Sequence, residues 1–126
     1  MSEPCKVMVV DDNHDVADSA VMLLQHWKHE AVAVYSAADC LAIAREFRPD
    51  VILMDIGLPG KTGFEVAYEL REICPDAKLV AITGYTEADI VRRAKDEGFC
   101  DFLLKPVETR ALKDAVDTQC SAKPIS

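Results

Sequence analysis

Four short apolar runs in this sequence are each followed at once by side chains that suit phosphoryl-transfer chemistry. In chain order, they are residues 7–10 before Asp11 and Asp12, 51–54 before Asp55, 79–82 before Thr83, and 102–104 before Lys105. If the runs are parallel strands, their carboxyl ends meet at one sheet edge, where open α/β sheets bind ligands. Three carboxylates, a hydroxyl and an ammonium would then share one crevice, which suits a divalent cation and a phosphoryl group.

The three acids predict a bound cation. At separations of about 5 Å and an effective dielectric constant of about 20, each pair of ionised carboxylates would cost about 3 kcal/mol. A whole domain is stable by only ~5–15 kcal/mol, so the carboxyls either take up protons or hold a cation. Mg²⁺ fits, because it binds through one or two carboxylates and keeps exchangeable waters, and Mn²⁺ is the alternative ion.

Asp55 is the candidate nucleophile of this set. A carboxylate can accept a phosphoryl group to give an aspartyl phosphate, and catalysis of that transfer is mostly positioning and charge neutralisation. Asp55 would end a central strand, between the acidic pair and the Thr83–Lys105 side of the sheet. The loop that follows is rich in Gly and Pro, so its backbone could come close and offer the Gly57 carbonyl to a metal.

The apolar runs alternate with longer amphipathic segments, which is typical of βα repeats and a parallel sheet. We expect strands at about 6–10, 31–35, 51–54, 79–82 and 101–104, and helices at about 14–28, 36–47, 62–73, 86–98 and 108–118. The predicted fold is (βα)5, a flavodoxin-like three-layer sandwich with a five-stranded parallel sheet in the order 2-1-3-4-5. That order brings the four polar strand ends together and makes strand 2 an edge.

Helix starts and stops carry their own signals. Three capping boxes are predicted, namely Ser36 with Asp39, Thr62 with Glu65, and Thr86 with Asp89. Gly98 is expected to terminate the fourth helix.

Length and charge limit the function classes. The 126 residues predict one domain over residues 1–120, a short tail over 121–126 and no output domain. The formal net charge of −8 argues against direct binding of nucleic acid or of an anionic membrane surface. The sequence has no signal peptide and no apolar stretch of the ~20 residues that span a bilayer, so we expect a cytoplasmic protein.

The five cysteines are far apart and form no C-x-x-C pair, which favours reduced thiols in a cytosolic protein. A zinc site is not expected, because no two cysteines have ligand spacing and no histidine lies close to them in sequence. His14, His26 and His29 are interpreted as solvated or half-buried helix residues.

Taken together, the motifs resemble the response-regulator receiver domain along nearly the whole chain. The matching segments are residues 9–13 (VVDDN), 54–60 (MDIGLPG), 82–84 (ITG) and 104–106 (LKP). The resemblance implies that a histidine kinase or a histidine phosphotransfer protein is the phosphoryl donor to Asp55. It also implies that Mg²⁺ is ligated by Asp12, Asp55 and the Gly57 carbonyl, with Asp11 acting through water.

The resemblance further implies a switch. Lys105 and Thr83 would contact the phosphoryl oxygens, and Phe102 occupies the position of the family's switch aromatic. The Lys105–Pro106 bond would be cis, and a downstream protein would read the face of the fourth helix, fifth strand and fifth helix. The sequence departs from the family pattern at two positions. Phe102 has no hydroxyl, and Gly57 has no side chain to steer a hydrolytic water. Tyr85 would partly cover the site instead.

Other interpretations remain open at this point. Asp11 and Asp12 could be a capping turn, Thr83 could satisfy a strand-end backbone group, Lys105 could be a surface lysine, and Phe102 could be core. A phosphohydrolase of the haloacid-dehalogenase kind also uses Asp, Thr or Ser, Lys and Mg²⁺, but it carries an acid where Gly57 stands. A pseudo-receiver that takes no phosphate is a third interpretation. An FMN-binding flavodoxin is a fourth and poorer one, because the sequence has no phosphate-binding loop after the first strand.

Overall fold

The computed structural model describes residues 4–57, 62–84 and 88–121 of the chain. Within these residues, five parallel strands form one sheet in the order β2-β1-β3-β4-β5, and five helices alternate with them. The bounds are β1 (Lys6–Val10), α1 (His14–His26), β2 (Glu30–Val34), α2 (Ala37–Phe47), β3 (Val51–Asp55), α3 (Gly63–Ile73), β4 (Lys78–Thr83), α4 (Ala88–Asp96), β5 (Asp101–Leu104) and α5 (Thr109–Ser121). The predicted fold and strand order are therefore confirmed.

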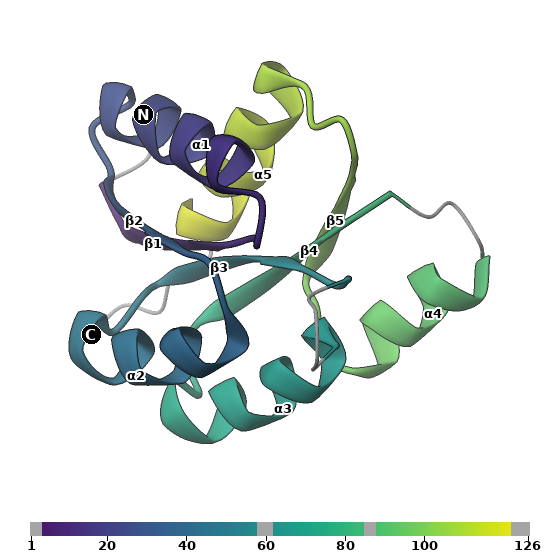
Figure 1. The fold of residues 1–126 in the computed structure, drawn as a ribbon. Coiled ribbons are helices and arrows are strands. Elements are labelled where there is room, and N and C mark those ends of the chain that lie inside the picture. Colours follow the sequence, from purple (N-terminus) through teal and green to yellow (C-terminus); the bar gives the residue numbers. More distant parts are fainter. Residues whose placement is uncertain (1–3, 58–61, 85–87, 122–126) are drawn as a thin grey trace.

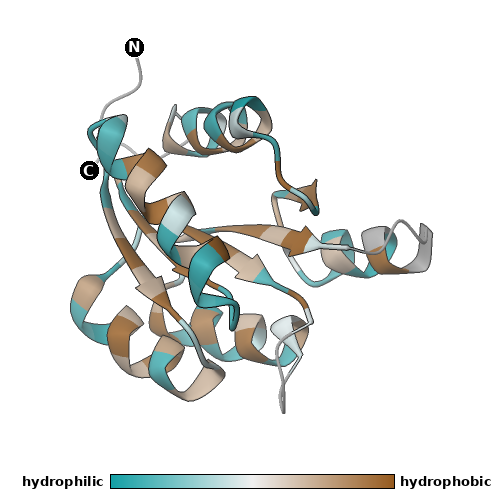
Figure 2. Ribbon diagram, turned by 45° about the horizontal axis from the view of Figure 1, so that its top comes forward, coloured by the Kyte–Doolittle hydropathy of each residue, from teal (hydrophilic) through white to brown (hydrophobic). Residues whose placement is uncertain are grey.

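Helices cover both faces of the sheet, as Figure 1 shows: α1 and α5 lie on one face, and α2, α3 and α4 on the other. Strand side chains alternate between the two faces. Val7 and Val9 pack under α1 and α5, whereas Met8 and Val10 pack under the opposite helices. The middle residues of the strands are accordingly apolar, and Figure 2 shows the strands as mostly brown ribbons between helices with mixed faces.

Three of the local helix signals are present in the described residues, although α1 ends at His26, two residues before the expected end. Thr62 and Glu65 form the predicted capping box of α3, and the Ser36 hydroxyl accepts a hydrogen bond from the Asp39 N–H at the start of α2. Gly98 follows α4 with a φ of +90°, a conformation that favours glycine. The third predicted box begins at Thr86, which lies outside the described residues.

Two expectations about the end of the chain are corrected. Helix α5 continues to Ser121 instead of ending near residue 118, because Cys120 is buried in the same core cluster as Cys5 and Val7. Cys120 is bonded to Cys5, so the expectation of five reduced thiols is wrong for these two. Residues 122–126 of the predicted tail lie outside the described part. In the part that is described, no helix is long and apolar enough to cross a membrane.

Candidate functional site

The carboxyl edge of the sheet gathers the residues that the sequence singled out. Asp55 and Thr83 are the last residues of β3 and β4, while Asp11 and Lys105 directly follow β1 and β5. Asp12 completes the group. Carboxylate oxygens of Asp11, Asp12 and Asp55 all lie within 4.8 Å of one another. The predicted convergence of three acids is therefore present in the structure.

Asp55 is held by hydrogen bonds to both of its carboxylate oxygens. Its Oδ1 accepts the backbone N–H of Gly57 at 2.9 Å, and its Oδ2 accepts from Lys105 Nζ at 3.0 Å. The side chain is buried. The start of α3 presses on the backbone behind it, because a Cβ on Gly63 would come within 2.9 Å of the Asp55 carbonyl oxygen. The two hydrogen bonds thus fix the orientation of the carboxylate, and the close approach of α3 restrains the backbone that carries it.

Asp11 is fully buried and incompletely satisfied. Its Oδ1 accepts the Asn13 N–H at 2.9 Å. Its Oδ2 lies 3.2 Å from Lys105 Nζ as an ion pair, yet no described residue gives it a hydrogen bond of good geometry. Burial raises the pKa of Asp11, the Asn13 bond opposes that rise, and the nearby Asp55 charge adds to it. A second partner for Oδ2 would relieve this cost.

Lys105 joins the two buried acids. Its Nζ lies 3.0 Å from Asp55 and 3.2 Å from Asp11. Burial alone would lower the pKa of Lys105, but the hydrogen bond and charge of Asp55, followed by those of Asp11, outweigh burial and raise it. Its backbone N–H donates to the Thr83 carbonyl at 2.8 Å, and the bond to Pro106 is cis, as predicted. One ammonium therefore faces a cluster of three carboxylates.

The cluster fits a small hard cation. Asp11 Oδ2 is a buried oxygen without a hydrogen-bond donor in the described residues, and Asp12 is exposed at the mouth of the site. An all-oxygen set of this kind is what Mg²⁺ and Mn²⁺ take, with the remaining positions open to water. Gly57 leaves room beside Asp55, since a Cβ there would stand at an ordinary 3.6 Å from Oδ1.

Two of the remaining predicted residues lie in described strands. Thr83 is buried at the end of β4, and Phe102 is partly buried against the core beneath α2, α3 and α4. Tyr85 and loop residues 58–61 lie outside the described residues.

The exposed His14 stacks on Tyr35 with ring centroids 3.8 Å apart. That contact was not predicted, because nothing in the sequence pairs a helix start with the residue after the neighbouring strand.

The opposite, amino edge of the sheet holds a group that sequence reasoning missed. Cys5, His29 and Cys120 are all buried there, with potential ligand atoms within 4.8 Å of one another. The interpretation of His29 as a solvated or half-buried helix residue is corrected: it follows α1, accepts a hydrogen bond from the Cys5 N–H just before β1 and is buried. Sequence spacing gave no signal, because the sheet order brings together residues 24 and 115 positions apart.

Comparisons with known proteins agree with this geometry. A family model described as "Response regulator receiver domain" matches residues 7–117. A response regulator receiver protein of Anaeromyxobacter sp. (strain Fw109-5) is 33% identical over 109 residues, which are 86% of this chain and 46% of that protein. Protein PilH of Pseudomonas aeruginosa is 31% identical over 118 residues, which are 89% of this chain and 94% of PilH.

Solved structures show the same fold. The crystal structure of a CheY-like response regulator receiver domain protein from Methanospirillum hungatei JF-1 superposes with a TM-score of 0.89. The match covers 96% of this chain and 97% of that one at 23% sequence identity. This likeness concerns the arrangement of strands and helices.

Proposed function

Since the chain belongs to the response regulator receiver domain family, the phosphoacceptor domains of two-component signalling, we propose that Asp55 is its phosphoacceptor. Receiver domains are phosphorylated by histidine kinases or histidine phosphotransfer proteins, so the donor is a phosphohistidine on such a partner. The proposal depends on one observation: Asp55 lies within 4.8 Å of two further carboxylates and 3.0 Å from an ammonium.

The chemistry follows from these positions. An Asp55 carboxylate oxygen attacks the phosphorus, the P–N bond to the donor imidazole breaks, and the phosphoryl group moves to Asp55. Lys105 reduces the repulsion between the anionic nucleophile and the anionic phosphoryl group. Asp12, Asp55 and the Gly57 carbonyl would hold Mg²⁺, with Asp11 acting through water. When bound, Mg²⁺ supplies further charge neutralisation for the phosphoryl oxygens.

Phosphorylation would then be read as a local charge change. The aspartyl phosphate adds acceptor oxygens and negative charge where Thr83 and Lys105 already lie. The Thr83 hydroxyl would bond one of these oxygens, and Phe102 would repack into the space that Thr83 leaves. A downstream protein would bind the altered face of α4, β5 and α5. Phe102 has no hydroxyl, so this switch acts through packing.

A groove between α1 and α5 supports the partner assignment. It is lined by apolar side chains that include Val16, Leu23 and Pro106, and Asp11 and Lys105 lie along the same groove. Val16 is exposed at 41% and so is accessible to a partner. The phosphodonor would place an apolar helix face here and its phosphohistidine next to Asp55.

The test is phosphorylation of the full chain by acetyl phosphate, followed by phosphate-affinity electrophoresis. We expect one shifted band that needs both Mg²⁺ and Asp55 and is absent from Asp55→Asn. Asp76→Asn is the matched control, because Asp76 is exposed in the turn between α3 and β4. Equal phosphorylation of Asp55→Asn would place the acceptor elsewhere.

Two further assays, turnover of a phosphate ester and binding of beryllofluoride, separate the alternatives. Catalytic turnover of a small phosphate ester without a partner would indicate a phosphohydrolase, whereas we propose that the chain assists only its own phosphorylation and dephosphorylation. A folded protein that takes neither phosphate nor beryllofluoride with Mg²⁺ would be a pseudo-receiver. The cytoplasmic location stays a prediction.

A further inference from the structure

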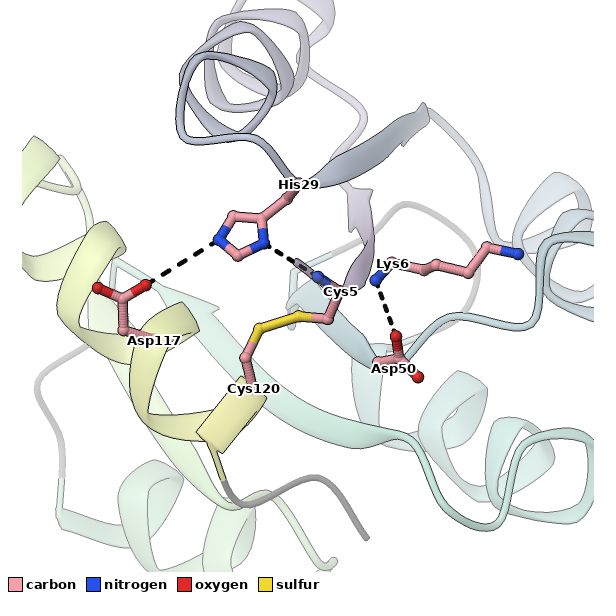
Figure 3. The surroundings of a disulfide bond; sticks show 6 residues. All are labelled: Cys5, Lys6, His29, Asp50, Asp117 and Cys120. Carbon is pink, nitrogen blue, oxygen red and sulfur yellow. Dashed lines mark hydrogen bonds and ion pairs between the residues drawn. A yellow bond between two sulfur atoms is a disulfide. The ribbon is translucent and has the colours of Figure 1, made fainter. Parts of the chain in front are cut away.

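A disulfide lies at the amino edge of the sheet, on the side away from Asp55. Cys5 directly precedes β1, and Cys120 lies in the last turn of α5 (Figure 3). Their Cα atoms are 6.1 Å apart, within the usual range for a disulfide, although 115 residues separate them in sequence. The bond therefore joins the first strand to the last helix.

The bond lies in a buried, hydrogen-bonded environment. Cys5 and Cys120 are 3% and 6% exposed, and His29 is 7% exposed. His29 Nδ1 accepts the Cys5 N–H at 3.2 Å, while Nε2 faces Asp117 at 4.0 Å, as Figure 3 shows. This pattern assigns the imidazole proton to Nε2 and engages the Nδ1 lone pair with the backbone. The histidine thus supports the Cys5 backbone in this state and has no lone pair free for a metal.

The pairing is selective among the cysteines. Cys40 and Cys74 stay unbonded thiols although Cys74 lies close enough to act on Cys40. Cys40 is buried with a pKa raised to about 12, mainly by burial and also by Cys74. The Cys74 thiol donates to the Ala44 carbonyl at 3.7 Å. Cys100 is an exposed thiol. These three thiols serve as internal controls for the bonded pair.

We propose that Cys5 and Cys120 form a reversible oxidation site that controls how firmly the end of α5 is held to the sheet. The inference takes the predicted cytoplasmic location as its premise, since disulfides in that compartment are usually transient and redox-sensing. It goes beyond the phosphoacceptor function and does not depend on it.

The oxidation balances with a peroxide as oxidant. One thiol is oxidised by hydrogen peroxide to a sulfenic acid and one water leaves; the second thiol then displaces a second water to form the S–S bond. Two thiols and one peroxide give one disulfide and two waters, with two electrons passing to the peroxide. A dithiol reductant reverses the step by thiol–disulfide exchange.

The location of the disulfide explains how oxidants reach the sulfurs and which part of the fold oxidation affects. The sulfurs are buried, but Cys120 lies one residue before the end of α5, and helix ends open locally more readily than sheet cores. Opening of that last turn would expose both sulfurs to small oxidants and reductants. Asp11 lies at the other end of β1, about 20 Å away for six extended residues at about 3.3 Å each. Oxidation should therefore stabilise α5 without changing the affinity of the acidic cluster for Mg²⁺.

The first experiment maps the thiols of the full chain after hydrogen peroxide or dithiothreitol, by alkylation under denaturing conditions and peptide mass spectrometry. We expect peroxide to remove Cys5 and Cys120 from the alkylated set together, and dithiothreitol to restore both without denaturant. Cys40 and Cys74 should remain alkylated. Failure of the pair to oxidise, or a bond that resists native reduction, overturns the proposal.

The second experiment measures hydrogen exchange and melting of the two forms. Oxidation should slow amide exchange in the last turns of α5 by at least about tenfold and raise Tm by roughly 5–15 °C. Cys120→Ala and Cys5→Ala should abolish both responses, and Cys100→Ala should keep them. If a variant fails to fold, the reduced wild-type chain supplies the same comparison. Equal α5 exchange in both forms of the wild type contradicts the proposal.

A zinc titration of the reduced chain completes the test. We expect Zn²⁺ to leave the rate at which peroxide oxidises Cys5 and Cys120 unchanged. Protection of both thiols by one equivalent of Zn²⁺ would show that Cys5, His29 and Cys120 are a metal site, and the proposal would be wrong.

Discussion

The two ends of the sheet in this protein bury polar groups in opposite ways. At the carboxyl edge, Asp11 and Asp55 are buried acids with one ammonium between them. At the amino edge, His29 is buried beside a disulfide and meets a carboxylate only at 4.0 Å. One end therefore keeps an excess of negative charge within reach of a ligand, and the other end closes its polar groups internally.

Burial acts on both ends with the same physical preference for the neutral form. It raises the pKa of Asp11 and lowers the pKa of His29. His29 meets that preference by staying neutral with both nitrogens directed at partners. Asp11 meets it poorly, because Asp55 adds a second negative charge beside it. The comparison teaches that, of these two edges, only the carboxyl edge holds repelling like charges, and there a bound cation would relieve the repulsion.

Gly63→Ala should have the largest effect on this contrast. The new Cβ would stand 2.7 Å from the Ile56 Cα and 2.9 Å from the Asp55 carbonyl oxygen, and backbone atoms cannot move aside cheaply. We expect a loss of about 3 kcal/mol in the free energy of unfolding, measured in urea, together with slower phosphorylation. Gly84→Ala is the control, since its Cβ would meet nothing within 4 Å among the described residues. Equal losses in the two variants would contradict this reading.

Lys105→Met should come next. It removes the ammonium that faces Asp11 and Asp55, and its side chain is about one-third exposed, so solvent screens part of the loss. We expect a loss of about 2 kcal/mol in metal-free buffer. Mg²⁺ should raise Tm more in this variant than in the wild type, because the cluster then has a larger uncompensated charge. A smaller Mg²⁺ response than that of the wild type would sink the argument.

His29→Gln tests the amino edge. The pKa of His29 is lowered in the folded state, so its contribution to stability is present above the unfolded pKa near 6.5 and is lost as the pH falls through the folded value. Wild-type stability should therefore fall between pH 7.5 and 5.5, by about 1 kcal/mol, and the variant should lose that slope. His26→Gln, at an exposed position, should keep it. Urea unfolding at the two pH values is the measurement.

Asp11→Asn should have the smallest effect, with the opposite sign. The substitution removes a buried carboxyl group whose ionised form is disfavoured by burial and by Asp55. The metal-free protein should therefore melt a few degrees higher. Calorimetric titration should show weaker Mg²⁺ binding by the same variant. A lower Tm without metal would mean that the Lys105 pair outweighs the repulsion.

The carboxyl edge could be predicted from sequence because each of its residues lies at or just after the end of an apolar strand. Asp55 and Thr83 are marked by buried runs of Val, Ile and Leu, and a parallel sheet brings such ends to one edge. Once the strand order was inferred, the cluster followed without any knowledge of side-chain packing. Thr62 and Glu65 were likewise predictable, because a capping box is local.

The amino edge could not be predicted in the same way. Cys5 and Cys120 come together because α5 packs its last turn beside the start of β1, and neither the helix length nor its final direction is local information. His29 was misjudged because the chain leaves α1 earlier than its apolar pattern suggested. The stack of His14 on Tyr35 depends on side-chain directions that periodicity does not carry.

The 6.1 Å between the Cα atoms of Cys5 and Cys120 makes the described chain nearly a closed ring. A peptide linker of a few residues could replace the sulfur bridge, and new termini could then be opened at the exposed Pro75–Asp76 turn. Such a circular permutant would keep every residue of the acidic cluster in its present strand register. The order in which the strands leave the ribosome would change, while the pocket they build would not.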